Sequence, residues 1–294
     1  PLHMLKIGND AHETNHPEYL ERYAMFEKAI HTWYPHMKLI GSAGSSFTNE
    51  YGRKAIEFFR ENQVKNPNFV YAIDLNQLIS REWRLNNQDI FAKLPKELQY
   101  SFCAYTDNEN DRSASNTLAE ALGMAGYMTN LEKNADVICM ANHCPVIGRV
   151  DYNPLTPYLI RFDDTDVFGT PAYYVMQMYA GKQQDYTLQS EIREDSTDQR
   201  VYHTVTYSPT GNTVSIKIIN PNADACTIRI DSDNLLRRGD YRIIQTILTA
   251  ADAAAQNTLE HPNTVIPVTD SYDADEVREL VVKPYSFTLF QIEM

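Results

Sequence analysis

The residues best placed to do chemistry lie near the start of the chain, where a polar pair follows an apolar run. Leu2–Ile7 is predicted to be a strand, and it ends in Gly8, Asn9 and Asp10. Catalytic groups of barrel enzymes occupy such carboxyl ends of strands, just before a βα loop. Asp10 could act as a general acid and Asn9 could hold a ligand hydroxyl; the alternative is that Asp10 caps the following helix or turn.

Two other constellations resemble metal or nucleophile sites. His12–His16 matches H-E-x-x-H, in which two His one helical turn apart bind zinc beside a Glu base. Pro17 follows at once and disfavours helical geometry at His16, and no convincing third ligand follows, so we interpret this segment as a polar loop. His143 and Cys144 lack a companion base at a recognisable spacing. We therefore predict no metal and no cofactor.

The elements that must position the first pair alternate between strand and helix over residues 1–181. This alternation predicts a parallel sheet with right-handed crossovers. Each predicted strand is a short apolar run that ends in a small or polar residue, as buried parallel strands do: Leu2–Ile7, Met37–Gly41, Phe69–Asp74, Tyr100–Tyr105 and Val137–Ala141.

Helical periodicity lies between these strands. Helices are predicted over residues 17–33, 49–65 and 117–134, and Thr117 with Glu120 forms a capping box at the start of the third. The first helix is expected to bury one face, composed of Leu20, Tyr23, Phe26, Ile30 and Trp33.

After about residue 181 the pattern changes to strict apolar–polar alternation with turn residues between the runs. This pattern predicts an antiparallel β-sandwich, jelly-roll-like, over residues 182–294. A hairpin turn is predicted at residues 208–212. The expected strands are 200–208, 213–219, 226–230, 241–248, 264–268 and 279–291.

Composition limits the classes of partner. The net charge of −13 would repel polyanions, so we predict no nucleic-acid partner and no anionic membrane surface as a partner. No apolar run approaches the length of a membrane span. The cellular compartment stays open, because any signal peptide would precede Pro1. A chain that has no initiator Met and starts inside a strand is expected to be part of a longer protein.

Long blocks of the chain resemble glycoside hydrolase family 51, the α-L-arabinofuranosidases. The resemblance covers nearly the whole chain and implies a (β/α)₈ barrel followed by a β-sandwich. The five predicted strands would then be strands four to eight of that barrel. The blocks that carry the resemblance are IGND with PEYLERYAMFEKAIHTWYPHMKLIGSAG, REWRLNN, NTLAEALGMAGYMTNLEKNADVICMA, LIRFDDTDVFGTPAYYVMQM, NTLEHPNTVIPV and KPYSFTLFQIE.

The resemblance also implies a retaining mechanism with two Glu, one as acid/base and one as nucleophile. This chain differs at both positions. The acid/base Glu corresponds to Asp10, whose side chain is one methylene shorter, and the nucleophile corresponds to Ala104 in Phe102–Tyr105. A methyl group cannot attack a sugar.

The sugar-contacting positions differ as well. In the sixth-strand motif the family's His falls on Asn76 and its second Tyr on Leu78, and a pocket Gln falls on Pro154. We expect a residual sugar pocket to involve Asn9 and Asn76 with the strand-end residues Tyr105 and Tyr152.

Three functions remain open at this point. The first is a family 51-like protein with impaired or lost arabinofuranosidase activity that still binds an arabinose-containing oligo- or polysaccharide. The second is an active enzyme with relocated carboxylates, such as Asp10 with Asp107 or Glu109. The third is a purely structural or interaction role for a degenerate paralogue of these enzymes. The fourth strand of the barrel would present an open edge, so we expect either the missing N-terminal half of the barrel or an oligomer.

Overall fold

The computed structural model describes residues 2–9, 18–77, 79–103, 115–152, 158–181, 184–193, 200–232, 236 and 239–294. The chain forms two compact units, and each is described by itself. The first contains residues 1–79, 90–108 and 134–144, and the second contains residues 80–89, 109–133 and 145–294. The five-stranded parallel sheet lies in the first unit and the sandwich in the second.

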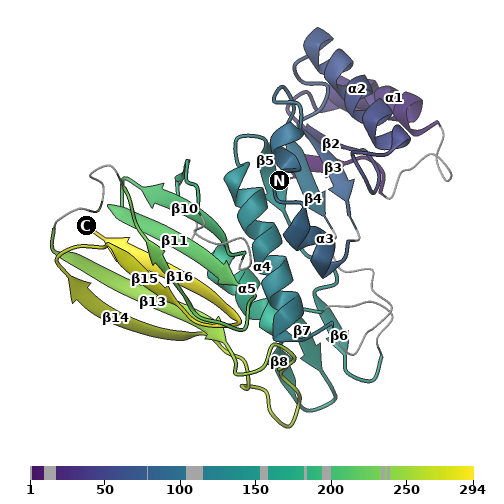
Figure 1. Cartoon of the computed structure of the whole chain (residues 1–294). Coiled ribbons are helices and arrows are strands. Elements are labelled where there is room, and N and C mark those ends of the chain that lie inside the picture. Colours follow the sequence, from purple (N-terminus) through teal and green to yellow (C-terminus); the bar gives the residue numbers. More distant parts are fainter. Residues whose placement is uncertain are drawn as a thin grey trace. The chain divides into compact units, whose positions relative to one another are not determined.

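The first unit is built on a five-stranded sheet in which neighbouring strands are neighbours in sequence and every pairing is parallel (Figure 1). This order confirms the predicted strand–helix alternation. Observed strands begin and end within a few residues of the predicted ones: β1 (Met4–Lys6), β2 (Lys38–Ser42), β3 (Ala72–Asn76), β4 (Tyr100–Cys103) and β5 (Ile138–Ala141).

Helices α1 (Tyr19–Trp33) and α2 (Glu50–Lys65) pack on one face of this sheet. Asn49 is the N-cap of α2, and its side chain accepts a hydrogen bond from Gly52 N at 2.7 Å. Tyr23 of α1 meets Phe59 of α2 edge to face, with ring centroids 4.9 Å apart. A Cβ on Gly41 would lie 2.2 Å from Phe59. The helix α2 therefore packs directly against the backbone of β2 at Gly41, where no side chain would fit. The short helix η1 (Phe91–Lys93) lies between β3 and β4 in the sequence.

The buried face of α1 differs from the predicted one. Tyr19, Tyr23 and Glu27 are the buried residues of α1, whereas Phe26 is 55% and Trp33 80% exposed. The prediction was right for Tyr23 and wrong for Phe26 and Trp33. It counted apolar residues at helical spacing, whereas Tyr19 and Tyr23 point inward and donate hydrogen bonds to Ile7 O and Phe69 O.

The second unit contains three helices and a small mixed sheet beside the sandwich. The helix α4 is almost entirely buried, because α3, α5 and the sandwich strands all contact it. Of its predicted capping box, one hydrogen bond is seen, from Glu120 N to Thr117 Oγ1 at 3.5 Å. These elements are α3 (Arg81–Asn86), α4 (Leu118–Lys133), α5 (Pro171–Ala180), β6 (Ile147–Arg149), β7 (Ile160–Phe162) and β8 (Val167–Gly169).

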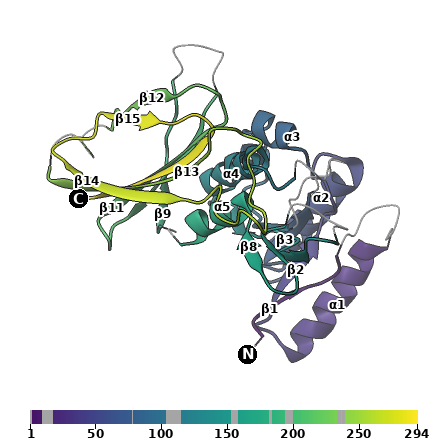
Figure 2. The same cartoon turned by 90° about the horizontal axis from the view of Figure 1, so that it is seen from below.

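The sandwich has a six-stranded antiparallel sheet in the order β14-β13-β16-β11-β10-β9 and a second layer made of β12 and β15 (Figure 2). The predicted hairpin joins β10 to β11. The strands are β9 (Tyr186–Leu188), β10 (Tyr202–Ser208), β11 (Thr213–Asn220), β12 (Cys226–Arg229), β13 (Tyr241–Thr249), β14 (Val268–Ala274), β15 (Glu279–Val282) and β16 (Ser286–Glu293).

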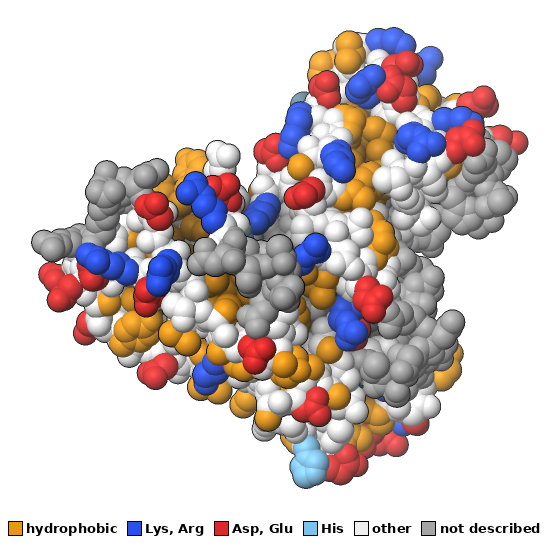
Figure 3. All heavy atoms as spheres, in the orientation of Figure 1, with side chains coloured by type: hydrophobic (Ala, Val, Ile, Leu, Met, Phe, Trp, Pro, Cys, Tyr) orange, Lys and Arg blue, Asp and Glu red, His pale blue; other side chains and the backbone are white. Residues whose placement is uncertain are grey.

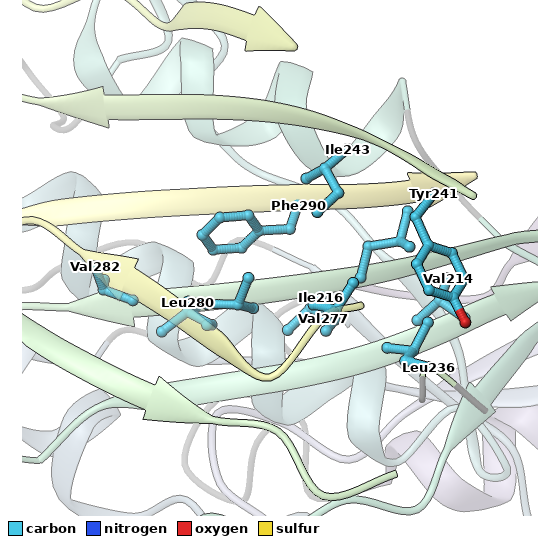
Figure 4. Close-up of a cluster of buried hydrophobic side chains, with 11 residues drawn as sticks. Val214, Ile216, Leu236, Tyr241, Ile243, Val277, Leu280, Val282 and Phe290 are labelled. Atoms are coloured by element: carbon cyan, nitrogen blue, oxygen red, sulfur yellow. The ribbon is translucent and has the colours of Figure 1, made fainter. Parts of the chain in front are cut away.

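The core of the sandwich lies between these two layers. In Figure 4, Ile216 and Phe290 of the long sheet point toward Leu280 and Val282 of β15. All four side chains are at most 5% exposed. Burying such apolar side chains is the main term that holds the two layers together.

Two strand predictions in the sandwich were wrong. The predicted strand 264–268 is mostly irregular, with bends at residues 264 and 265, and the strand β14 starts only at Val268. β14 was missed because its residues are mostly exposed and polar. The predicted run 279–291 is two strands, since Pro284 interrupts the ladder and Tyr285 has a φ of 41°.

The surface fits the composition. On the face drawn in Figure 3, acidic and basic side chains are interspersed. None of the described helices has the length and apolar character needed to cross a membrane.

Candidate functional site

The candidate site lies at the carboxyl end of β1 and is built on an ion pair. Lys6 Nζ lies 2.6 Å from Asp74 Oδ2 and donates to Asn9 Oδ1 at 2.6 Å. The Asp74 side chain is completely buried, whereas that of Lys6 is 25% exposed. Asn9, a predicted binding residue, is exposed and is held by this ammonium.

The three strands bring Lys6 and Asp74 to one face. Lys6 pairs with Ile40 of β2, and two residues further on Ser42 of β2 pairs with Asp74 of β3. Side chains at alternate positions of a strand share a face. Gly41, between Ile40 and Ser42, faces α2, so Lys6, Ser42 and Asp74 face away from the helices. This is the inner face of a (β/α)₈ sheet.

Tyr19 of α1 fixes the backbone beside this ion pair. Its hydroxyl donates to Ile7 O at 2.6 Å and accepts from Ser42 N at 2.8 Å. Burial raises the pKa of Tyr19 well above its usual range, and the neighbouring Asp74 carboxylate raises it further. The phenol therefore stays neutral and keeps both hydrogen bonds.

Gly8 allows the chain to turn next to Tyr19. Its φ is +80°, and a Cβ there would lie 2.6 Å from the Tyr19 ring. Both facts exclude a side chain at this position. The close packing of Gly8 against the Tyr19 ring therefore fixes the path of the chain from β1 to Asn9.

Asn76, a second predicted binding residue, lies at the end of β3 on the same face as Asp74. It is half-buried, and its backbone N donates to Gly44 O at 2.9 Å. The structure thus places Asn9 just after β1 and Asn76 at the end of β3, both at the carboxyl ends of strands of one sheet.

The remaining predicted site residues lie outside the described residues or in the second unit. Asp10, Ala104 and Tyr105 lie outside the described residues, as do Asp107 and Glu109. Tyr152 belongs to the second unit and is 68% exposed.

The metal-like motifs have no described site. His12–His16 lies outside the described residues. His143 is buried just after β5, and Cys144 beside it is exposed. Across the described parts of the chain, no group of three or more His, Cys, Asp or Glu could hold a metal ion.

Sequence reasoning missed Lys6 and the role of Asp74. A signal was present: a Lys inside an otherwise apolar predicted strand needs a buried partner, because an unpaired buried charge is strongly disfavoured. The sequence did not show which carboxylate it would meet, since β2 separates the two strands.

Comparison with known proteins agrees with this architecture. A family model described as the α-L-arabinofuranosidase C-terminal domain matches residues 82–286. α-L-Arabinofuranosidase 2 of Arabidopsis thaliana is 23% identical over 99% of this chain and 41% of its own length. α-L-Arabinofuranosidase A of Aspergillus niger is 24% identical over 87% of this chain and 40% of its own length. The chain thus spans well under half the length of these curated relatives.

Solved structures show the same fold. An arabinose-bound family 51 α-L-arabinofuranosidase superposes with a TM-score of 0.79 at 20% identity, over 98% of this chain and 44% of the other. The arabinose complex of the Thermotoga maritima α-L-arabinofuranosidase gives a TM-score of 0.73 at 16% identity, over 98% of this chain and 66% of the other. The fold is therefore a partial (β/α)₈ barrel followed by a β-sandwich.

Proposed function

Because this chain belongs to the α-L-arabinofuranosidase C-terminal domain family, we propose that it is a family 51-like protein whose retaining hydrolysis is impaired or lost. We further propose that it still binds arabinose-containing oligo- or polysaccharides through the barrel face that carries Asn9 and Asn76.

The observation that carries the proposal is Ala104 at the nucleophile position. It follows directly on Cys103, the last residue of β4, and corresponds by resemblance to the Glu that attacks the anomeric carbon. Retention needs one carboxylate to form the glycosyl-enzyme bond and a second to protonate the leaving oxygen. An alanine at the first position removes the covalent step.

The acid/base position adds to this argument. Asp10 keeps an ionisable proton, but its carboxyl group ends roughly 1–1.5 Å short of where a Glu would reach, and such a displacement costs a large factor in rate. By resemblance, both reacting residues are replaced while the sequence blocks around them are retained. This combination supports the proposal that the barrel no longer hydrolyses glycosides.

Binding is supported by the residues that remain. Amide side chains such as Asn9 and Asn76 donate and accept hydrogen bonds, which suits sugar hydroxyls. Tyr105 and Tyr152 are proposed as aromatic contacts to the sugar. Relatives with this fold have been solved with arabinose bound.

The test is hydrolysis of an aryl α-L-arabinofuranoside by the 294-residue chain, with Asp10→Asn as the matched control. We expect the two proteins to release the aryl alcohol at the same background rate. Faster release by the unmodified chain would contradict the proposal. If Asp107→Asn or Glu109→Gln then abolished that release, the active enzyme with relocated carboxylates would be supported instead.

Calorimetry with arabino-oligosaccharides separates binding from a purely structural role. We expect a measurable binding heat that Asn76→Ala weakens by about tenfold, as the loss of one or two hydrogen bonds to a bound sugar predicts. No heat with any arabino-oligosaccharide would favour the structural relative.

A further inference from the structure

We propose that Lys6 is a positioning residue: anchored on Asp74, its ammonium fixes the Asn9 amide with the oxygen toward Lys6 and the NH₂ group toward a bound sugar. The role toward the sugar rests on the proposed binding function. Asn9 was already a candidate contact, whereas Lys6 and Asp74 add a device that holds it in one orientation.

The anchor of this device is rigid. Asp74 lies on β3, which pairs on one side with β2 and on the other with β4. Its backbone oxygen also accepts from Ala43 N at 2.9 Å. The carboxylate is completely buried, so its position is set by the sheet.

The geometry demands a long cation at position 6. β2 lies between β1 and β3, and two strand spacings amount to about 10 Å. A Lys side chain crosses most of this distance over the inner face, while a short polar side chain would not reach Asp74. Arg is the only other residue type with the same charge and comparable length.

The chemistry of the ammonium decides how Asn9 is oriented. A Lys ammonium has three donors and no acceptor, so the Asn9 atom that it contacts at 2.6 Å must be the carbonyl oxygen. The NH₂ group is then on the opposite branch of the amide plane, directed away from Lys6. This orientation presents N–H donors, which pair with the hydroxyl or ring oxygen of a furanose.

The backbone between the two residues is also held. Tyr19 binds Ile7 O, and Gly8 turns against the Tyr19 ring. Lys6 and Asn9 therefore face each other over a fixed distance, and the amide loses little additional freedom when a ligand binds.

The test compares four proteins. Lys6→Met with Asp74→Leu replaces the whole ion pair by apolar side chains of similar volume, which avoids a stranded buried charge. Lys6→Arg keeps the charge and the reach. Lys96→Met removes a Lys from an exposed ion pair of the same unit, with Asp136, and controls for a general change in charge. The fourth protein is the unmodified chain.

The first measurement is ¹⁵N relaxation of the Asn9 side-chain NH₂ group, assigned by its disappearance in Asn9→Ala. We expect a restricted amide in the unmodified chain, in Lys6→Arg and in Lys96→Met. In the double variant we expect the order parameter to fall below about 0.6, the range of flexible groups. An unchanged order parameter in the double variant would overturn the proposal.

The second measurement is calorimetry with an arabino-oligosaccharide. We expect the double variant to lose about tenfold in affinity, and Lys6→Arg to recover most of it. A mobile Asn9 with undiminished affinity would also overturn the proposal. If the unmodified chain bound no sugar, the proposed function would fail, and the order parameter would still decide whether Lys6 positions Asn9.

Discussion

At the residue scale, the Lys6–Asp74 pair combines a completely buried carboxylate with a partly exposed ammonium. Apart from the ionic contact with Lys6, no described residue donates a hydrogen bond to either carboxylate oxygen of Asp74. The contact with Lys6 is therefore the main compensation for burying this charge. Removing one partner of such a pair costs more than removing both, because the remaining charge is left in a low-dielectric environment.

This asymmetry makes a stability prediction. Lys6→Met is expected to lower the free energy of unfolding by about 2–4 kcal/mol, less than for a fully buried pair because Lys6 retains some contact with water. Lys96→Met, which breaks an exposed pair, should change it by less than about 1 kcal/mol. Urea unfolding measures both. Equal effects would mean that Asp74 does not depend on Lys6.

At the element scale, α4 is held to the long sheet by buried charges. Lys217 of β11 is completely buried and forms a salt bridge with Glu132 of α4, which also accepts from Thr204 of β10. Next to Glu132, Lys133 Nζ lies 3.4 Å from His203 Nδ1. The end of α4 therefore places one anion, Glu132, and one cation, Lys133, against β10 and β11.

His203 makes this contact sensitive to pH. Burial, and to a lesser extent the Lys133 ammonium, lowers the pKa of His203 from 6.5 to about 4, against a hydrogen bond with the Ser190 backbone that raises it. Between these two pH values the unfolded chain binds a proton that the folded chain does not. Stability is therefore complete above about pH 6.5 and falls as the pH drops toward 4, by up to about 3 kcal/mol.

Thermal unfolding between pH 4 and 7 measures this effect. In His203→Gln the part of the slope that belongs to this residue should disappear, because Gln does not titrate in this range. A slope that is identical in the two proteins would show that folding does not lower the pKa of His203.

At the scale of the whole molecule, the outer strand β1 pairs only with β2 in the described sheet. Two apolar residues of the same unit are exposed: Trp33, the last residue of α1, is 80% exposed, and Leu2, two residues before β1, is 68% exposed. Open strand edges with apolar neighbours are sites of association. We propose that further βα units or a second copy of the chain cover this edge.

The 294-residue chain alone is therefore expected to self-associate in a concentration-dependent manner. Trp33→Glu together with Leu2→Lys should shift it toward monomer in analytical ultracentrifugation, since two charges oppose burial of that surface. Val64→Glu, a change at another exposed apolar residue, is the control. A monomer at every concentration would exclude the second copy.

Local patterns in the sequence determined much of this protein. Short apolar runs with polar ends predicted all five parallel strands, alternation predicted the sandwich, and the Thr117 capping box placed the start of α4. These features depend on neighbours a few residues apart. The blocks around Asn9 and Ala104 likewise indicated the family.

Only the tertiary structure decided which charges meet. Lys6 reaches Asp74 across β2, and Lys217, in an alternating run that suggests an outward side chain, is buried against Glu132. Phe26 and Trp33, apolar at helical spacing, are exposed. Such outcomes depend on strand register and on which face another element covers, and no pattern of near neighbours contains that information. The sequence therefore proposed Asn9 and Asn76 for the candidate site, while the ion pair beside Asn9 was found only in the fold.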